Sequence, residues 1–156
     1  DVGTGTGDLP SRIHRDAERH GKDVWIVGTD ISPALLSSHR EAFDAVACGD
    51  AVRLPFRDGS ADLVTCSQLL HHFDEPQARV VIAELHRVAK QGGAVIIADL
   101  RRSRLAAAGF WVACWLFGFH PVTRRDGVTS VYRGFTAAEL ATMVATIDSE
   151  LKELPP

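Results

Sequence analysis

Three glycines at alternate positions stand near the start of the chain, within the sequence DVGTGTGDLP of residues 1–10. A backbone without side chains bends tightly and lets a ligand approach closely. The residues that follow, from Leu9 to His20, have the apolar spacing of a helix, and the first N–H groups of a helix have no partner within it. Gly3, Gly5 and Gly7 therefore predict a loop that binds a nucleotide-like ligand in front of a helix.

Polar side chains stand at the ends of three short apolar segments further along the chain. These residues are Asp30, Asp50 and Ser67. In a parallel sheet, ligands bind at the carboxyl ends of the strands, which share one edge of the sheet. We therefore expect Asp30, Asp50 and Ser67 to meet the glycine loop at that edge. Such convergence is stronger evidence for a binding site than the glycines alone.

The segments between these residues alternate between strands and helices. The expected strands are residues 23–29, 45–48, 61–67 and 94–100, and the expected helices run over 9–20, over 33–43 and from 75 to a stop at 91–93. Strands that are apolar throughout are typical of a parallel sheet. The predicted fold class is therefore α/β, a Rossmann-like doubly wound and mostly parallel sheet with helices on both faces.

The sequence begins inside the glycine motif, at Asp1, whereas such a loop normally follows a strand of about five residues. We therefore expect a fragment whose first strand is truncated. That strand would lie at the centre of the sheet, so its loss would leave a gap there.

The length of 156 residues suits one domain. We expect a cofactor-binding core over residues 1–101. Residues 102–156 would supply helices that form the acceptor site or a lid, including one opened by the capping box Thr136–Glu139. A C-terminal strand is expected to start within residues 149–154.

The segment Leu105–Phe119 has no polar side chain and is flanked by arginines. As a helix it is shorter than the roughly 20 residues that a bilayer span needs. It could cover the binding pocket, line the acceptor site or make peripheral contact with a membrane surface. A buried or lid helix is the favoured interpretation.

Composition narrows the class of protein. Hydrophobic residues make up 46% and charged residues 24% of the chain, as in soluble globular proteins, and the net charge of −3 argues against a nucleic-acid partner. Cys48, Cys66 and Cys114 lie far apart beside apolar neighbours. We expect reduced thiols in a cytoplasmic protein, with no metal site and no disulfide framework. Oligomeric state is left open.

Two common phosphate-binding loops do not fit the glycine motif. The dinucleotide fingerprint needs a third glycine where this chain has Asp8, and an acidic side chain at a helix start is unfavourable for a pyrophosphate. A P-loop would continue with Gly-Lys-Ser/Thr, which is missing here. The motif suits a nucleoside without phosphates better than NAD, which makes a dehydrogenase the weaker alternative.

The sequence resembles the class I S-adenosylmethionine-dependent methyltransferases, and within them the ubiquinone/menaquinone-biosynthesis type. The motifs that carry the resemblance are DVGTGTG at 1–7, GTDISP at 28–33, GDA at 49–51, DLVTCS at 62–67, LHHF at 70–73 and ELHRVAKQGG at 84–93. They follow the family's order over residues 1 to about 101. Gln91 stands where the family usually has proline, but the turn Gly92-Gly93 is retained.

The resemblance implies a set of residues that bind S-adenosylmethionine. These are Asp1, Gly3, Thr4, Gly5, Gly7, Asp30, Ile31, Asp50, Ala51 and Ser67. The two oxygens of Asp30 would bind the ribose hydroxyls, Ile31 would pack on the adenine and Asp50 would accept its amino group. Asp1 would reach the amino-acid end of the cofactor.

His71 and His72 are candidates for a general base. A histidine titrates near neutrality, and a hydroxyl acceptor must lose its proton as it attacks. The sequence does not separate the two residues, and a packing role is the favoured interpretation.

The implied reaction is in-line transfer of a methyl group to a small molecule, apolar or lipid-like, which leaves S-adenosylhomocysteine. It needs alignment and exclusion of water more than catalytic side chains. Whether oxygen, nitrogen or carbon is methylated is left open. The alternative is a cofactor-binding domain that is catalytically incompetent, either a fragment or a degenerate domain.

Overall fold

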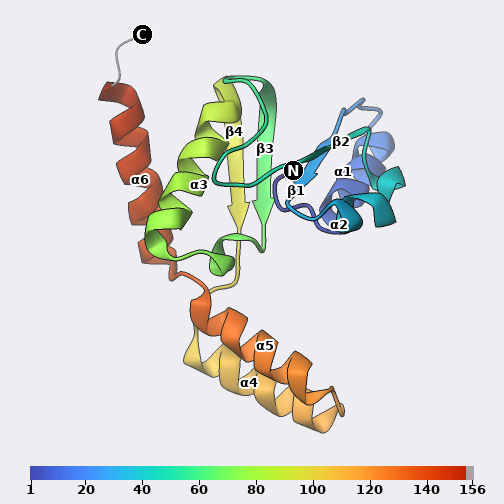
Figure 1. The fold of residues 1–156 in the computed structure, drawn as a ribbon, viewed down its shortest axis with the longest axis vertical. Helices are drawn as coiled ribbons and strands as arrows, with labels where there is room; N and C mark the ends of the chain where they lie inside the picture. The colour runs from blue at the N-terminus through green and yellow to red at the C-terminus, as the bar shows by residue number, and fades with distance from the viewer. Residues whose placement is uncertain (154–156) are drawn as a thin grey trace. The chain divides into compact units, whose positions relative to one another are not determined.

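The computed structural model describes the backbone of residues 1–153 and the side chains of residues 1–147 (Figure 1). Its strands are β1 (Val27–Asp30), β2 (Ala45–Cys48), β3 (Ala61–Ser67) and β4 (Ala89–Ala98). Its α-helices are α1 (Asp8–Arg19), α2 (Pro33–Ser38), α3 (Glu75–Val88), α4 (Arg104–Leu116), α5 (Pro121–Arg133) and α6 (Ala137–Glu153). Two short 3-10 helices are η1 (Arg40–Ala42) and η2 (Leu70–His72).

The chain forms two compact units. Unit 1 comprises residues 1–69 and 80–98, and unit 2 comprises residues 70–79 and the chain from Asp99 onward. Unit 1 therefore contains the sheet, and unit 2 contains η2 and helices α4 to α6. The predicted boundary at residue 101 lies close to the passage of the chain from Ala98 to Asp99.

Val2 connects two pairs of parallel strands. β1 pairs with β2 and β3 pairs with β4, and Val2 forms parallel bridges to Thr29 of β1 and to Cys66 of β3. The N–H of Val2 donates to the Thr65 carbonyl at 2.8 Å, and the N–H of Thr29 donates to the Asp1 carbonyl at 2.9 Å. The order is thus β2-β1-Val2-β3-β4, and the predicted parallel α/β fold is confirmed.

A groove of about 590 Å³ lies in unit 1, lined by Asp1 and Val2 together with residues 23–27 and 60–65. It occupies the space beside Val2, between the chain that leads into β1 and the first half of β3. The expected strand over residues 23–29 is formed only from Val27 onward. Residues 23–26 line the groove instead, and of these the Ile26 carbonyl accepts the Ala45 N–H of β2 at 3.3 Å.

β4 is more exposed than the sequence predicts. The expectation of a continuous buried strand over residues 94–100 is wrong, because Ile96 is 54% exposed and half-buried residues alternate with exposed ones along residues 94–98. The physical reason is that successive side chains point to opposite faces of a sheet, and the face of β4 that carries Ala94, Ile96 and Ala98 is left exposed. β4 also starts at Ala89, so α3 ends at Val88, ahead of the predicted stop at 91–93.

The capping box of α6 is confirmed. The Thr136 N–H donates to Glu139 Oε2 at 2.8 Å, and the Glu139 N–H donates to Thr136 Oγ1 at 3.2 Å. The expected strand over residues 149–154 is wrong as far as Glu153, because α6 continues to that residue. Leu151 follows Ile147 by four residues, so the helical spacing of apolar residues continues there.

Replacing Val2 by alanine tests how much the buried Val2 side chain stabilises unit 1. Val2 is 3% exposed, so loss of two buried methyl groups should lower the free energy of unfolding by about 2 kcal/mol. The matched control is Val80→Ala on α3, where the valine is 48% exposed and the change should stay within about 0.5 kcal/mol. Equal effects of both substitutions in urea denaturation would contradict a stabilising role for the buried Val2 side chain.

Candidate functional site

The glycine loop has a left-handed backbone at all three glycines, with φ of +66° at Gly3, +52° at Gly5 and +81° at Gly7. A Cβ at Gly7 would lie 2.6 Å from the Ala42 Cβ and 2.7 Å from the Phe43 ring, so only glycine fits there. A Cβ at Gly5 would meet no heavy atom within 4 Å. The backbone at Gly5 therefore faces open space in which a ligand can approach.

The carboxylate of Asp30 holds this loop against the end of β1. The Gly5 N–H donates to Asp30 Oδ2 at 3.0 Å, and the Ser32 N–H donates to Oδ1 at 2.9 Å. A carboxylate has about four acceptor sites, so each oxygen of Asp30 can accept a further hydrogen bond. Two such sites side by side are the acceptors that a vicinal diol requires.

The carboxylate of Asp1 accepts hydrogen bonds from two threonines. The hydroxyl of Thr4 donates to Oδ2 and that of Thr65 donates to Oδ1, each at 2.6 Å. Thr65 was not identified from the sequence, although a polar residue inside an apolar strand is the signal that could have found it. Next to this pair, Thr29 Oγ1 is buried without a hydrogen-bond partner among the described residues.

The predicted site residues that come next in the chain lie at the ends of β1 and of its neighbour β2. Asp30 is in register with Cys48 of β2, and the Gly49 N–H donates to the Asp30 carbonyl at 3.1 Å. Ile31 is 69% exposed and Ala51 is buried. Asp50 is exposed, and its Oδ1 accepts the Val52 N–H at 3.1 Å within its own turn. An apolar surface and an acceptor carboxylate thus flank the diol-type site.

Ser67 ends β3 on the other side of the glycine loop. Gln68 follows with φ of +52°, and its N–H donates to the Ala98 carbonyl at 2.8 Å. A glutamine in this conformation carries backbone strain, and sequence reasoning missed it. The Leu69 side chain lies 2.8 Å from the position that a Cβ on Gly3 would take. The structure therefore brings all of the predicted cofactor residues to the carboxyl ends of Val2, β1, β2 and β3.

Arg87 and Glu84 on α3 fix the loop that carries Asp50. The Arg87 guanidinium donates to both carboxylate oxygens of Glu84 at 2.7 Å, and also to the Leu54 and Phe56 carbonyls. Glu84 in turn accepts the Leu54 N–H at 2.7 Å. The hydrogen bonds from Arg87 hold the pKa of Glu84 below its ordinary value. Sequence reasoning missed both residues as positioning groups.

In unit 2 the structure gives the two histidines different environments. His71 and Asp99 are both 6% exposed at their side chains, and His71 Nδ1 lies 2.7 Å from Asp99 Oδ1. Asp99 also accepts the N–H groups of His71 and Leu100. A carboxylate acceptor at Nδ1 assigns the proton to that nitrogen and leaves Nε2 as the basic one. Asp99 was not identified from the sequence.

His72 has a different environment. It is exposed, and its ring centroid lies 4.2 Å from that of His71. Partial desolvation, followed by the charge of a protonated His71, lowers the pKa of His72. No carboxylate orients the ring of His72 in the described residues, so His71 is the better candidate for a base.

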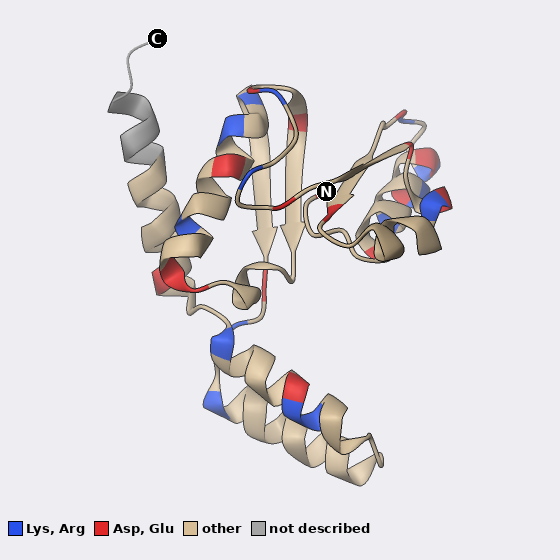
Figure 2. Cartoon of the chain, in the orientation of Figure 1, with Lys and Arg blue, Asp and Glu red and all other residues tan. Residues whose placement is uncertain are grey.

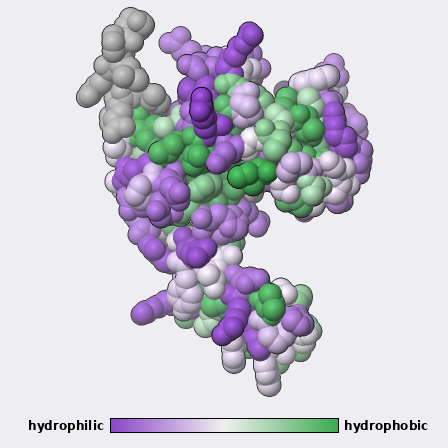
Figure 3. Space-filling model, in the orientation of Figure 1, coloured by the Kyte–Doolittle hydropathy of each residue, from purple (hydrophilic) through white to green (hydrophobic). Residues whose placement is uncertain are grey.

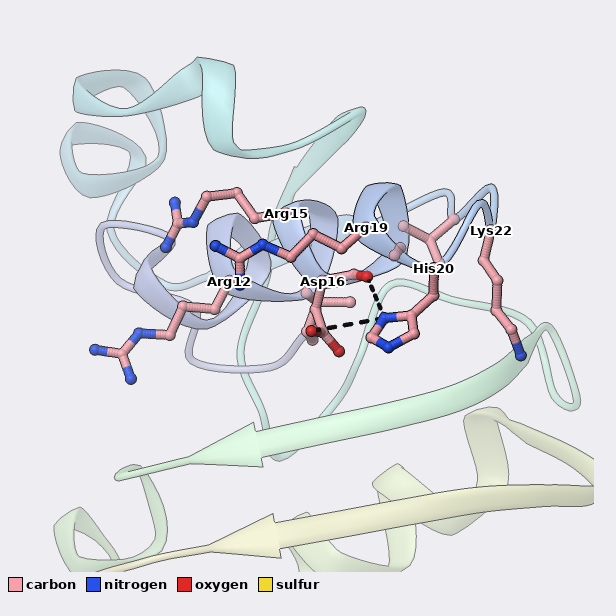
Figure 4. Close-up of a pocket in the computed structure, with 9 residues that line it drawn as sticks. Arg12, Arg15, Asp16, Arg19, His20 and Lys22 are labelled. Atoms are coloured by element: carbon pink, nitrogen blue, oxygen red, sulfur yellow. Dashed lines mark hydrogen bonds and ion pairs between the residues drawn. The ribbon is translucent and has the colours of Figure 1, made fainter.

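A second cavity, of about 860 Å³, lies along α1 and is lined largely by cationic side chains (Figure 4). Arg12, Arg15, Arg19 and Lys22 contribute to it, and His20 Nδ1 lies 2.8 Å from the Asp16 carbonyl. None of the predicted cofactor residues lines it. We interpret it as the solvated face of an amphipathic helix.

The described residues bring together no group of three His, Cys, Asp or Glu side chains that would hold a metal ion. Among the described helices, none combines the length and the hydropathy that crossing a bilayer requires.

Comparison with known proteins gives a consistent set of relatives. The family described as "Methyltransferase domain" matches residues 1–97. The chain is 36% identical over 104 residues to a ubiquinone/menaquinone biosynthesis C-methyltransferase of Desulfotalea psychrophila, covering 64% of this chain and 39% of the relative. It is 34% identical over 134 residues to a demethylmenaquinone methyltransferase of Deinococcus radiodurans, covering 81% and 52%. The chain thus spans about half or less of the length of these relatives.

A solved structure has the same fold. A SAM-dependent methyltransferase of Thermotoga maritima matches with a TM-score of 0.61 at 21% identity, covering 94% of this chain and 60% of that one. At this level of identity the match shows the fold alone.

Replacing Glu84 by glutamine tests the positioning role of the Glu84–Arg87 pair. Loss of the charged hydrogen bonds should cost about 1–3 kcal/mol of unfolding free energy at pH 7. Because folding lowers the pKa of Glu84 from its ordinary 4.5, this stabilisation is present above pH 4.5 and is lost as the pH falls through the lower, folded-state pKa.

The difference between wild type and Glu84→Gln should therefore shrink as the pH drops below 4.5. Glu75→Gln is the matched control, because that glutamate is 60% exposed and pairs with Arg79 on the surface, where a pair contributes about 0–1 kcal/mol. A difference that stays constant from neutral to acid pH would argue against the pair.

Proposed function

Since this chain belongs to the methyltransferase domain family, we propose that it binds S-adenosylmethionine at the carboxyl ends of its central strands and transfers the methyl group to a small-molecule acceptor. The observation that carries the proposal is the hydrogen bond from the open backbone of Gly5 to Asp30 Oδ2, 3.0 Å long. It joins a left-handed glycine loop to a carboxylate with free acceptor sites, which is a suitable combination for a nucleoside.

The residues at this edge of the sheet fit each part of such a cofactor. Asp30 would accept the ribose hydroxyls, and exposed Ile31 would pack on the adenine. Asp50 would accept the adenine amino group, and Ser67 would contact the methionine moiety. Asp1, whose charge is held in place by the hydroxyls of Thr4 and Thr65, would attract the cofactor's ammonium group. No pyrophosphate site is needed, which agrees with the acidic Asp8 at the start of α1.

When bound, the cofactor supplies a methyl group on a positively charged sulfur, and the sulfur leaves as a neutral thioether. The residues of this chain then have to orient the acceptor and keep water out. Such a reaction places few demands on catalytic side chains, apart from a base when the acceptor carries a hydroxyl.

We infer that the acceptor is a reduced quinone. One relative is named for ubiquinone/menaquinone biosynthesis and the other as a demethylmenaquinone methyltransferase. A hydroquinone ring becomes a stronger nucleophile when a hydroxyl loses its proton. His71 would accept that proton at Nε2, with Asp99 holding the opposite ring nitrogen at 2.7 Å. Along the chain, Asp99 directly follows β4 and His71 follows β3 by four residues.

A domain that binds the cofactor without turnover is the second candidate. Binding of S-adenosylhomocysteine, measured by heat stability, together with methyl transfer to 1,4-dihydroxynaphthalene supports the enzyme. Binding without transfer favours the second candidate, and the absence of both contradicts the proposed function.

Replacing Asp30 by asparagine tests the cofactor site. Loss of charged hydrogen bonds to the ribose should weaken binding of S-adenosylhomocysteine by about 1–3 kcal/mol in calorimetric titration. Asp16→Asn, at a carboxylate 70% exposed on α1, should leave the affinity unchanged. An unchanged affinity of Asp30→Asn, with an unchanged melting temperature, would move the ribose site elsewhere.

Replacing His71 by glutamine tests the base. General-base catalysis contributes about 10²–10⁴-fold, so the rate of methyl transfer to 1,4-dihydroxynaphthalene should fall by that range, while affinity for S-adenosylhomocysteine is retained. Asp99→Asn should lower the rate in the same direction by releasing the ring. His72→Gln is the control and should change the rate less than threefold; a larger effect of His72→Gln than of His71→Gln would overturn the assignment.

A further inference from the structure

The hairpin formed by α4 and α5, residues 104–133, exposes large apolar side chains. Only Ala107 and Cys114 of α4 are buried, and α5 buries no residue. Trp115 is 64% exposed and Phe117 is 78% exposed. Further large apolar side chains exposed on the hairpin are Leu105, Phe110, Trp111, Val112, Leu116, Phe119, Val122 and Tyr132. Figure 3 shows apolar side chains at the surface of this hairpin.

One face of α4 packs on α5 and the opposite face is left exposed. The ring of Phe110 occupies the space that a Cβ on Gly127 would take, so the helices touch there. At 100° per residue, Ala107, Phe110 and Cys114 share this side of α4. Leu105, Val112, Trp115 and Leu116 lie on the opposite side by the same count. These four exposed side chains therefore share one apolar face of α4.

The charges around this face are almost all positive (Figure 2). Residues 101–133 carry six arginines and one aspartate, a net charge of +5, in a chain whose net charge is −3. The arginines are Arg101, Arg102, Arg104, Arg124, Arg125 and Arg133. The Arg124 guanidinium lies 5.6 Å from the centre of the Trp111 ring. Cationic and aromatic groups are thus placed together.

We propose that this apolar face of α4 docks on the surface of a lipid bilayer that contains anionic headgroups. Interfacial helices combine an apolar face that includes aromatic rings with arginines or lysines that reach the headgroups. α4 is about 20 Å long at 1.5 Å per residue, short of the roughly 30 Å of a hydrocarbon core, so it lies in the interface and does not span. Arg104 at one end and Arg124 and Arg125 near the other end contact the lipid phosphates.

Charge complementarity separates a membrane from a second copy of the chain. A symmetric contact between two such faces would bring together two hairpins that each carry four arginines and one aspartate, and these net positive charges repel each other. An anionic bilayer offers an apolar interior and negative headgroups at once. This inference does not depend on methyl transfer.

Flotation with vesicles tests the proposal on the full chain. The test vesicles contain phosphatidylcholine with 30 mol% phosphatidylglycerol, about one third of the lipid, which makes the membrane strongly anionic. These vesicles should retain the protein more than vesicles of phosphatidylcholine alone. Added salt should weaken the retention. In a Trp25→Phe variant, the two remaining tryptophans, Trp111 and Trp115, should shift their emission to the blue on binding.

Two hairpin variants identify the surface. Trp115→Ser with Phe117→Ser, and Arg124→Glu with Arg125→Glu, should each lower partitioning into the anionic vesicles at least tenfold, the second pair by about thirtyfold or more. Matched controls are Trp25→Ser and Arg57→Glu at exposed positions of unit 1, which should change it less than twofold. All of these side chains are exposed except that of Arg124, which is partly buried. The melting temperature of each variant is measured as well, and an unchanged value shows that the variant is folded.

Retention that both hairpin variants abolish supports the proposal. Three results would overturn it. The first is no retention by anionic vesicles, and the second is retention that the hairpin variants do not change, which would favour the basic residues of α1. The third is self-association in size-exclusion chromatography that the hairpin variants abolish while vesicles are not bound.

Discussion

The rest of unit 1 depends on the backbone pairing of Val2 with two strands at once. β1 with β2 and β3 with β4 are separate hydrogen-bonded pairs, and Val2 bridges Thr29 on one side and Cys66 on the other. The residues before and after Val2 are thereby fixed: Asp1 lies beside Thr65, and the glycine loop starts at the edge where the strands end. Since the alignment of the site follows from this register, a shift by one residue would exchange the faces of Asp1 and Val2.

The cofactor site is assembled chiefly by polar contacts to the backbone. Asp30 accepts N–H groups from Gly5 and Ser32, and Arg87 reaches the carbonyls of Leu54 and Phe56 from α3. Each contact fixes a loop whose own sequence has no regular structure. These loops can therefore present Asp30 and the neighbouring Asp50 in defined positions without long strands behind them.

The sequence predicts the local elements better than the contacts between residues that lie far apart in the chain. Motif spacing identifies the glycine loop and Asp30, because a positive φ and a strand-end carboxylate have direct sequence signals. Thr65, Arg87 and Asp99 act through contacts with residues at least 28 positions away, and one sequence has no signal for such pairs. The exposure of Ile96 was also missed, since an apolar strand pattern does not tell which face of the sheet is covered.

We expected residues 105–119 to form a buried or lid helix, because we assumed that their apolar side chains pack against other parts of the chain. In the described residues α4 finds cover along one side only, through Phe110 and Gly127. The close approach at Gly127 limits the contact to a narrow strip, because small residues bring helices together without adding apolar area. The tryptophans at 111 and 115 therefore remain at the surface, beside arginines that a buried helix would not need. The net charge of the whole chain hides this feature, since the acidic residues that outnumber the basic ones lie almost entirely outside the hairpin. A local charge balance along the chain, taken with local hydropathy, is therefore the better guide to a surface that meets a membrane.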